Sequence, residues 1–190
     1  FTKYRESATT LGVYNSGGGP AQALAKLDLT TGNLDTTFTQ STVLTQSSGA
    51  TSNVYSLAVN PANNSLYVGG TFTTYRGTFT AQALAKLDLT TGNLDTTFTQ
   101  SSGLVNGIVY SLAVNPANNS LYVGGLFTSY RGGIANSGGI GANNLIKIDL
   151  STGNADFLYY KNYNVDKQIY ALALSPQNSS LYVGGAFLHF

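Results

Sequence analysis

The sequence predicts an all-β fold built from about three copies of one unit. The first observation is repetition: residues 21–41 recur unchanged at 81–101, and residues 54–70 recur unchanged at 109–125. The second is that short Val-, Leu- and Tyr-rich runs alternate with turns containing Pro, Asn or Gly, which favours strands. The third is that no stretch shows the capped 3.6-residue apolar period of an amphipathic helix.

The whole chain, 1–190, is interpreted as a single repeat array, because self-similarity at a nearly fixed period is typical of repeat architectures. Diverged copies of the two repeated stretches stand at 143–157 and 169–185. Counted from the Phe that follows each Gly-Gly pair, the units are approximately 1–71, 72–126 and 127–186, with 187–190 starting the next.

Each unit is expected to hold four short β-segments, described here for the first complete unit. Residues 54–59 form the first, which ends at the Pro/Asn turn NPANN, and residues 65–73 return from that turn. Residues 83–89 form the third and run into the Gly-containing turn TTGN. A short fourth segment covers residues 94–98. Turn residues at these spacings are what a meander of antiparallel strands requires.

The two faces of the first segment differ in size, because side chains alternate along a strand. The bulky face carries Tyr55, Leu57 and Val59, and the small face carries Val54, Ser56 and Ala58. We expect such sheets to stack with the large face of one on the small face of the next, and Gly69-Gly70 to permit a close approach or a bulge. Four-stranded sheets stacked radially are β-propeller blades. A β-solenoid is the alternative, although its rungs are usually shorter.

The repeated positions resemble the delta-60 repeat, a β-propeller-like unit of bacterial and archaeal proteins. The matching residues in the first complete unit are Val54, Tyr55, Leu57, Val68, Gly69, Gly70, Phe72, Leu84, Leu87, Gly92, Leu94, Asp95 and Phe98. The chain departs from that pattern where the family has Asp-Gly turns, since it has PANNS and TTGN instead. The resemblance implies blade-like units of large surface or secreted proteins, and it implies no shared catalytic residues.

The composition excludes several classes of function. Nine Lys plus Arg stand against eight Asp plus Glu, so the chain has no basic excess that would support nucleic-acid binding. No run approaches the length of about 18–20 apolar residues that a membrane span needs. Cysteine is absent, which excludes disulfides and thiolate metal sites. The charged share of 9% is low, and the surface rich in hydroxyl and amide groups favours an extracellular or cell-surface location.

The charged residues do not form an expected catalytic or metal site. Most recur in every unit, as do Asp28, Asp88 and Asp149, which we expect to accept backbone N–H bonds in their turns. His189 is the only histidine and has no second imidazole, and nothing pairs the non-repeated Glu6 and Asp166 into an acid/base couple. The Gly-rich stretches 15–20 and 137–142 lack the Lys of a phosphate loop. We therefore expect no catalytic residue, no metal and no cofactor.

Two repeated polar features are candidate contact sites. The pairs Tyr75-Arg76 and Tyr130-Arg131 are expected either to stack at the blade rim or to contact a ligand such as a glycan. N-glycosylation sequons start at Asn63, Asn118 and Asn178, all in the first hairpin turn of a unit. The alternative for these three residues is a purely conformational role, because Asn tolerates the left-handed region.

The two chain ends fall at the same point of the repeat. The C-terminal stretch supplies the first two strands of a blade, whereas residues 23–38 supply a second half without a first. Complementary unpaired edges favour pairing between copies, since three blades in one chain are fewer than the usual four of a propeller. The residues expected at such a subunit interface are Phe1, Tyr4, Leu24, Leu27, Leu29, Tyr170, Leu172, Leu181, Val183 and Phe187.

The sequence thus predicts a non-catalytic extracellular structural protein that assembles head to tail as a filament or ring, with itself as partner. The first alternative is a segment of a larger surface propeller that binds a glycan or a protein. A propeller enzyme of quinoprotein or lyase type is the third hypothesis, and the lack of a unique acid, base or ligand cluster disfavours it.

Overall fold

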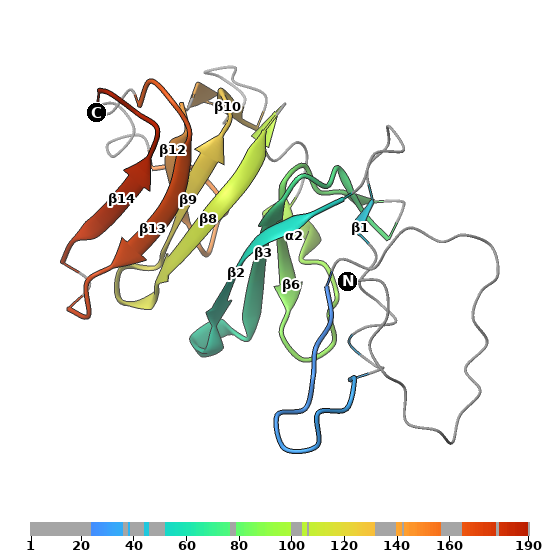
Figure 1. Ribbon diagram of the computed structural model, residues 1–190. Helices are drawn as coiled ribbons and strands as arrows, with labels where there is room; N and C mark the ends of the chain where they lie inside the picture. Colours follow the sequence, from blue (N-terminus) through green and yellow to red (C-terminus); the bar gives the residue numbers. More distant parts are fainter. Residues whose placement is uncertain are drawn as a thin grey trace.

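The computed structural model describes residues 24–35, 38, 44–45, 52–76, 79–99, 104–105, 107–131, 140–141, 143–156, 165–177 and 179–189 (Figure 1). Within these residues the protein is all-β, and its main sheets stand side by side in a stack that is not closed into a ring (Figure 1). No helix in this part of the chain is long and apolar enough to cross a membrane.

Three main antiparallel sheets repeat one topology. The first has the order β2-β3-β6, the second β8-β9-β12, and the third holds β13-β14. The strands of the first are Val54–Asn60, Ser65–Gly70 and Leu84–Asp88; those of the second are Ile108–Asn115, Ser120–Leu126 and Leu145–Asp149; those of the third are Ile169–Leu174 and Leu181–Gly185. The register also repeats, since Ser65 lies opposite Asp88 and Ser120 lies opposite Asp149.

The first hairpin of each complete blade turns through a short 3-10 helix, η1 (Pro61–Asn63) and η2 (Pro116–Asn118). Proline fits the first position because its missing N–H is not needed there. The Asn60 side chain accepts a hydrogen bond from the Ala62 N–H, and Asn64 closes the turn at a φ of 51°. Asn is one of the few residues that adopt this left-handed conformation readily, so the PANN sequence determines the turn.

Two small three-stranded sheets are formed largely by the segments between the second and third strands of the two complete main sheets. In the first, β4 (Thr74–Tyr75) pairs with β1 (Leu44–Thr45) and β5 (Phe79–Thr80). In the second, β10 (Ser129–Tyr130) pairs with β7 (Leu104–Val105) and β11 (Ile140–Gly141). They carry the chain from the second strand of a blade to its third.

Among the described residues the expected fourth segment pairs through a single bridge in each unit, such as Leu87 with Leu94, and in the first complete unit it then turns helical in α2 (Thr96–Thr99). The physical reason is Asp95, whose side chain accepts hydrogen bonds from the N–H groups of Thr97 and Phe98. An Asp in this position caps a helical turn rather than extending a strand.

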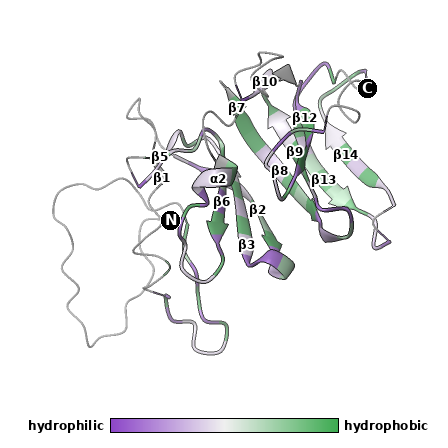
Figure 2. Cartoon of the chain, turned by 180° about the vertical axis from the view of Figure 1, so that it is seen from behind, coloured by the Kyte–Doolittle hydropathy of each residue, from purple (hydrophilic) through white to green (hydrophobic). Residues whose placement is uncertain are grey.

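The sheets stack with a bulky face on a small face, as expected, but the bulge at Tyr55 interrupts the alternation, so that the Val54 position joins Leu57 on the bulky face instead of Ser56 on the small one. Leu112 and Val109 of β8 lie directly over Gly69 of β3, where a Cβ atom would overlap with them. Ser56 and Ala58 of β2 face the same junction. Ile169 and Leu172 of β13 lie over Gly124 in the same way. Hydrophobic residues concentrate in these strands, whereas the turn after β2 is hydrophilic (Figure 2).

Candidate interaction surfaces

One end of the stack carries a half-built blade made of residues 24–38. Leu27 and Leu34 form the same bridge as Leu87 and Leu94, and Lys26 pairs with Asp35 at 3.0 Å. The segment is anchored by Leu24 and Phe38, which are buried against β3 and β6 of the first sheet. It therefore repeats the second half of a blade, with no first half beside it among the described residues.

The exposure of this segment shows which contacts a complete blade would add. Leu27 is 38% exposed and Leu29 is fully exposed, whereas their equivalents Leu87 and Leu89 are fully and partly buried. On the neighbouring strand β2, Leu57 is 50% exposed, although Leu112 at the same position of the next blade is 8% exposed. Apolar side chains at this end thus lack the cover that the repeat gives them elsewhere.

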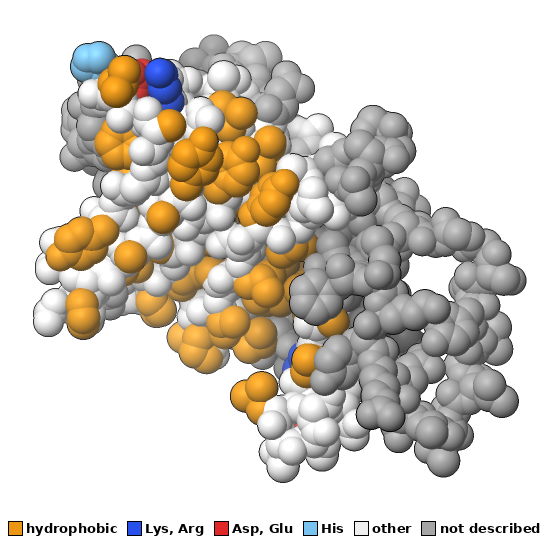
Figure 3. Space-filling model, in the orientation of Figure 1, with side chains coloured by type: hydrophobic (Ala, Val, Ile, Leu, Met, Phe, Trp, Pro, Cys, Tyr) orange, Lys and Arg blue, Asp and Glu red, His pale blue; other side chains and the backbone are white. Residues whose placement is uncertain are grey.

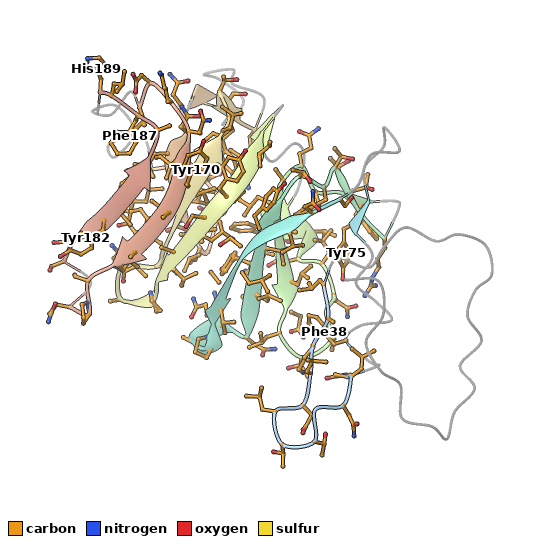
Figure 4. All side chains as sticks on the ribbon, in the orientation of Figure 1. Phe38, Tyr75, Tyr170, Tyr182, Phe187 and His189 are labelled. Atoms are coloured by element: carbon orange, nitrogen blue, oxygen red, sulfur yellow. The ribbon has the colours of Figure 1, made fainter. Side chains whose placement is uncertain are left out.

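The other end of the stack is the outer face of β13-β14, where the labelled Tyr182 lies (Figure 4). Tyr182 is 64% exposed, whereas Tyr67 and Tyr122 at the same position are buried. In the described chain β14 pairs only with β13, although β3 and β9 each have a partner on both edges. This end therefore presents both an unpaired strand edge and an uncovered sheet face.

The predicted interface residues fall into four groups. Leu24 is buried in the chain's own core, while Leu27, Leu29 and Tyr170 are exposed. Phe1 and Tyr4 lie outside the described residues. The remaining four are partly buried against Leu145, Val165 and Ile169: Leu172, Leu181, Val183 and Phe187.

The Tyr-Arg pairs are internal contacts. Tyr75 and Tyr130 are buried, and their hydroxyls donate to the carbonyls of Gly92 and Gly153. Arg76 stacks 5.3 Å from the Tyr75 ring centroid, and Arg131 repeats this at 5.4 Å over Tyr130. The rim-stacking interpretation thus matches the geometry, and the interpretation of these two tyrosines as ligand contacts does not, because buried rings offer no face to a sugar.

The sequon residues lie in exposed turns as far as the structure describes them. Asn63 and Asn118 are exposed in η1 and η2, and Asn178 lies outside the described residues. Ser65 and Ser120 of the same sequons are buried and donate to the carbonyls of Asn63 and Asn118. Glycosylation stays a prediction, which the mass of the peptides from secreted protein would test.

A row of tyrosines on the first strand of each main sheet was not predicted from the sequence. Tyr55, Tyr110 and Tyr170 stack along β2, β8 and β13, with ring centroids 5.5 Å and 5.4 Å apart. Each lies at a register shift of its strand pair, so the bulge directs the ring to the surface. Figure 3 shows exposed hydrophobic side chains where these strands follow one another. The sequence feature that could have indicated the bulge is the Gly-Gly pair on the strand opposite each tyrosine.

The repeated aspartates stabilise their turns, as expected. Asp88 accepts hydrogen bonds from the N–H groups of Thr90 and Thr91, and Asp28 and Asp149 do the same. Gly92 completes the turn at a φ of 70°. The backbone hydrogen bond from Thr91 is the main cause that lowers the pKa of Asp88, and those of Thr31 and Thr152 lower the pKa of Asp28 and Asp149.

These shifts predict acid sensitivity. A carboxyl whose pKa is lower in the folded than in the unfolded state stabilises the fold above the unfolded value of 3.8, and this contribution is lost as the pH falls through the folded value. The free energy of unfolding in urea should therefore decrease below pH 3.8. Asp88→Asn, which keeps an acceptor but no titrating group, should reduce this decrease. An unchanged pH slope in the variant would contradict the assignment.

No group of three or more His, Asp or Glu side chains that could hold a metal occurs in the described part of the chain. Two ion pairs were not predicted from the sequence, and both are structural. Lys86 contacts Asp95 at 2.9 Å, and Lys147 contacts Asp156 at 2.7 Å. His189 pairs with Asp166 at 3.3 Å beside the last strand. The described residues thus offer end faces and an aromatic row as candidate sites.

A family model described as a β-propeller domain of unknown function (DUF5122) matches residues 62–98. The matched stretch covers the end of η1, β3, β6 and most of α2. No curated protein matches the chain. The match supports a β-propeller-type repeat, so the stacked sheets are blades, and it indicates no enzyme family.

Proposed function

We propose that this chain is a non-catalytic structural β-propeller subunit that assembles head to tail, each copy completing the half-built blade of the next. The observation that carries the proposal is the exposure of Leu27 at 38% in a segment whose repeat equivalent, Leu87, is fully buried. Burying such side chains is favourable by about 25 cal/mol for each Å² of apolar surface. The missing cover is a strand pair of the kind that β13-β14 provides.

The repeat predicts how two copies would pair. Within a blade, Leu66 lies opposite Leu87 and Val68 lies opposite Ala85. The same register places Leu181 of one copy opposite Leu27 of the next, and Val183 opposite Ala25. The contact would be a strand addition, in which backbone hydrogen bonds continue the sheet across two chains.

The two surfaces lie at opposite ends of the stack (Figure 1). Pairing between chains satisfies both without forcing three blades into a ring, which is fewer than the usual four. If the rotation closes, two copies make a six-bladed ring; if it does not, the contact propagates as a filament. The delta-60 resemblance and the 9% charged share support an extracellular or surface location for either assembly.

The second candidate is a segment of a larger surface propeller that binds a glycan or a protein. The row of Tyr55, Tyr110 and Tyr170 favours it, because aromatic faces contact sugar rings well and the two outer rings, Tyr55 and Tyr170, are about half exposed. In that case further repeats rather than a second copy would cover the two ends.

An engineered disulfide tests the proposed register directly, since the chain has no cysteine. Opposite residues of an antiparallel pair have Cα atoms about 4.5–5.5 Å apart, within the span a disulfide bridges. Mixing an Ala25→Cys chain with a Val183→Cys chain under oxidising conditions should give a covalent heterodimer on non-reducing gels. Light scattering of the unmodified chain should show a mass at least twice 19.9 kDa.

The matched control is Thr30→Cys in place of Ala25→Cys, which is exposed on the same half-blade but out of register. It should give much less heterodimer. A chain that stays monomeric at all concentrations and forms no Ala25–Val183 cross-link would contradict self-assembly and favour the second candidate.

A further inference from the structure

The two junctions between blades inside the chain share one polar contact. The Ser56 hydroxyl oxygen accepts a hydrogen bond from the Leu112 N–H at 3.0 Å, and the Ser111 hydroxyl oxygen accepts from the Leu172 N–H at 2.9 Å. Both donors lie next to the bulges of their strands, where the backbone ladder is disrupted. Each serine thus satisfies a backbone donor of the following blade.

The same junctions share a second feature, a glycine over which two apolar side chains of the next blade pack. The space above this glycine is called the glycine socket. A Cβ atom on Gly69 would overlap with Val109 and crowd Leu112, and a Cβ on Gly124 would lie 2.6 Å from Ile169 Cγ2. The third member of the series, Gly184, is open: the nearest atom a Cβ would meet is Ala171 Cβ at 3.7 Å. The socket is therefore present on the outer face of β13-β14 but empty.

The side chains that would fill it stand at the other end of the chain. The residues equivalent to Val109 and Leu112 in the first sheet are Val54 and Leu57, and Leu57 is 50% exposed. On the socket side, Tyr182 is 64% exposed where Tyr67 is buried. Leu57 on the bulky face and Tyr182 on the small face are thus uncovered at the two ends, while Val54 already packs in part against the cluster that holds Leu24 and Phe38.

We propose that Val54 and Leu57 of a second copy pack on Gly184, and that Ala171 makes this junction weaker than the two within the chain. Ala171 occupies the position of Ser56 and Ser111. It has no hydroxyl to accept the Leu57 N–H of the incoming copy, and an unsatisfied buried donor is costly. This inference rests on the proposed assembly and adds its contact face and its strength.

This difference in strength between the two kinds of junction means that the assembly would come apart between copies. The blades of one chain are joined by the backbone and by junctions that have the serine, while copies would meet only through the junction that has alanine. Assembly would accordingly be reversible and concentration-dependent, with the exchanged unit always one whole chain.

Sedimentation velocity over a concentration series tests the inference on four chains: unmodified, Ala171→Ser, Gly184→Val and Ala173→Ser. Ala171→Ser should lower the dissociation constant about tenfold, which corresponds to 1.4 kcal/mol. Gly184→Val should abolish association while the circular dichroism spectrum stays unchanged, because the added side chain fills the socket. Ala173→Ser is the matched control on the same face, at a position where Ala58 and Ala113 have no hydroxyl either, and it should not tighten association.

The outcomes separate this inference from the proposed function. If the unmodified chain associates but Ala171→Ser and Gly184→Val behave like it, the copies meet through another surface and the inference is wrong. If neither the unmodified chain nor Ala171→Ser associates, the proposed assembly itself fails. If Ala173→Ser tightens association as much as Ala171→Ser, the specific role of position 171 is excluded.

Discussion

Leu112→Ala is expected to lower the free energy of unfolding by about 2–5 kcal/mol, the range for truncating a buried leucine. Leu112 is 8% exposed and lies over Gly69 at the junction of the first two complete blades. Its removal leaves a cavity between two stacked sheets, where neither backbone can move closer without disturbing the Ser56 hydrogen bond. Urea unfolding followed by tyrosine fluorescence measures the loss.

The matched control is Leu57→Ala, the same substitution at the same repeat position. Leu57 is 50% exposed, so its truncation should cost the isolated chain about 1 kcal/mol or less. The comparison is made at a concentration where the chain is monomeric. Equal losses in the two variants would mean that the first sheet is covered as fully as the second, and would contradict the open end.

Gly124→Val is expected to destabilise the chain by about 1–3 kcal/mol, the usual cost of overpacking a tight core. A Cβ atom at this position would lie 2.6 Å from Ile169 Cγ2 and 3.2 Å from Leu172 Cδ1. Both contacts belong to the next blade, so the two sheets would have to separate. The midpoint of thermal unfolding should fall accordingly.

Gly184→Val makes the same change one blade later, where nothing crowds the added side chain. The backbone of Gly184 is not in the left-handed region, and valine favours strands, so the folded chain should keep its stability. A loss as large as that of Gly124→Val would show that this face is already occupied in the single chain.

Much of the local structure is predictable because each turn depends on residues that are neighbours in sequence. Asp88 and Gly92 stand four residues apart and define their turn by themselves, as do Pro61 and Asn64 in the first hairpin. The alternation in 56–59 likewise predicts which face is bulky. It fails at 54–55, because the bulge at Tyr55 places Val54 on the face of Leu57.

The remaining features depend on contacts between residues far apart in the chain. The fourth segment is an exception, because it was expected to be extended although the cap that makes it helical is local, from Asp95 to Phe98 three residues on. The pairing of Lys86 with Asp95 requires the hairpin to fold back first. The tyrosine row requires three bulges in three sheets to align, which no single unit specifies.

The sequence by itself determined the repeated blade, its hairpin turns and the alternation of large and small faces, because each follows from residues within one unit. The tertiary structure alone decided which copies of identical residues are covered. Tyr67 and Tyr182 stand in two copies of the same sequence, SLYVGG, yet Tyr67 is buried and Tyr182 is 64% exposed. The physical reason is that burial depends on the neighbouring blade, which lies beside Tyr67, whereas no described sheet lies beside Tyr182.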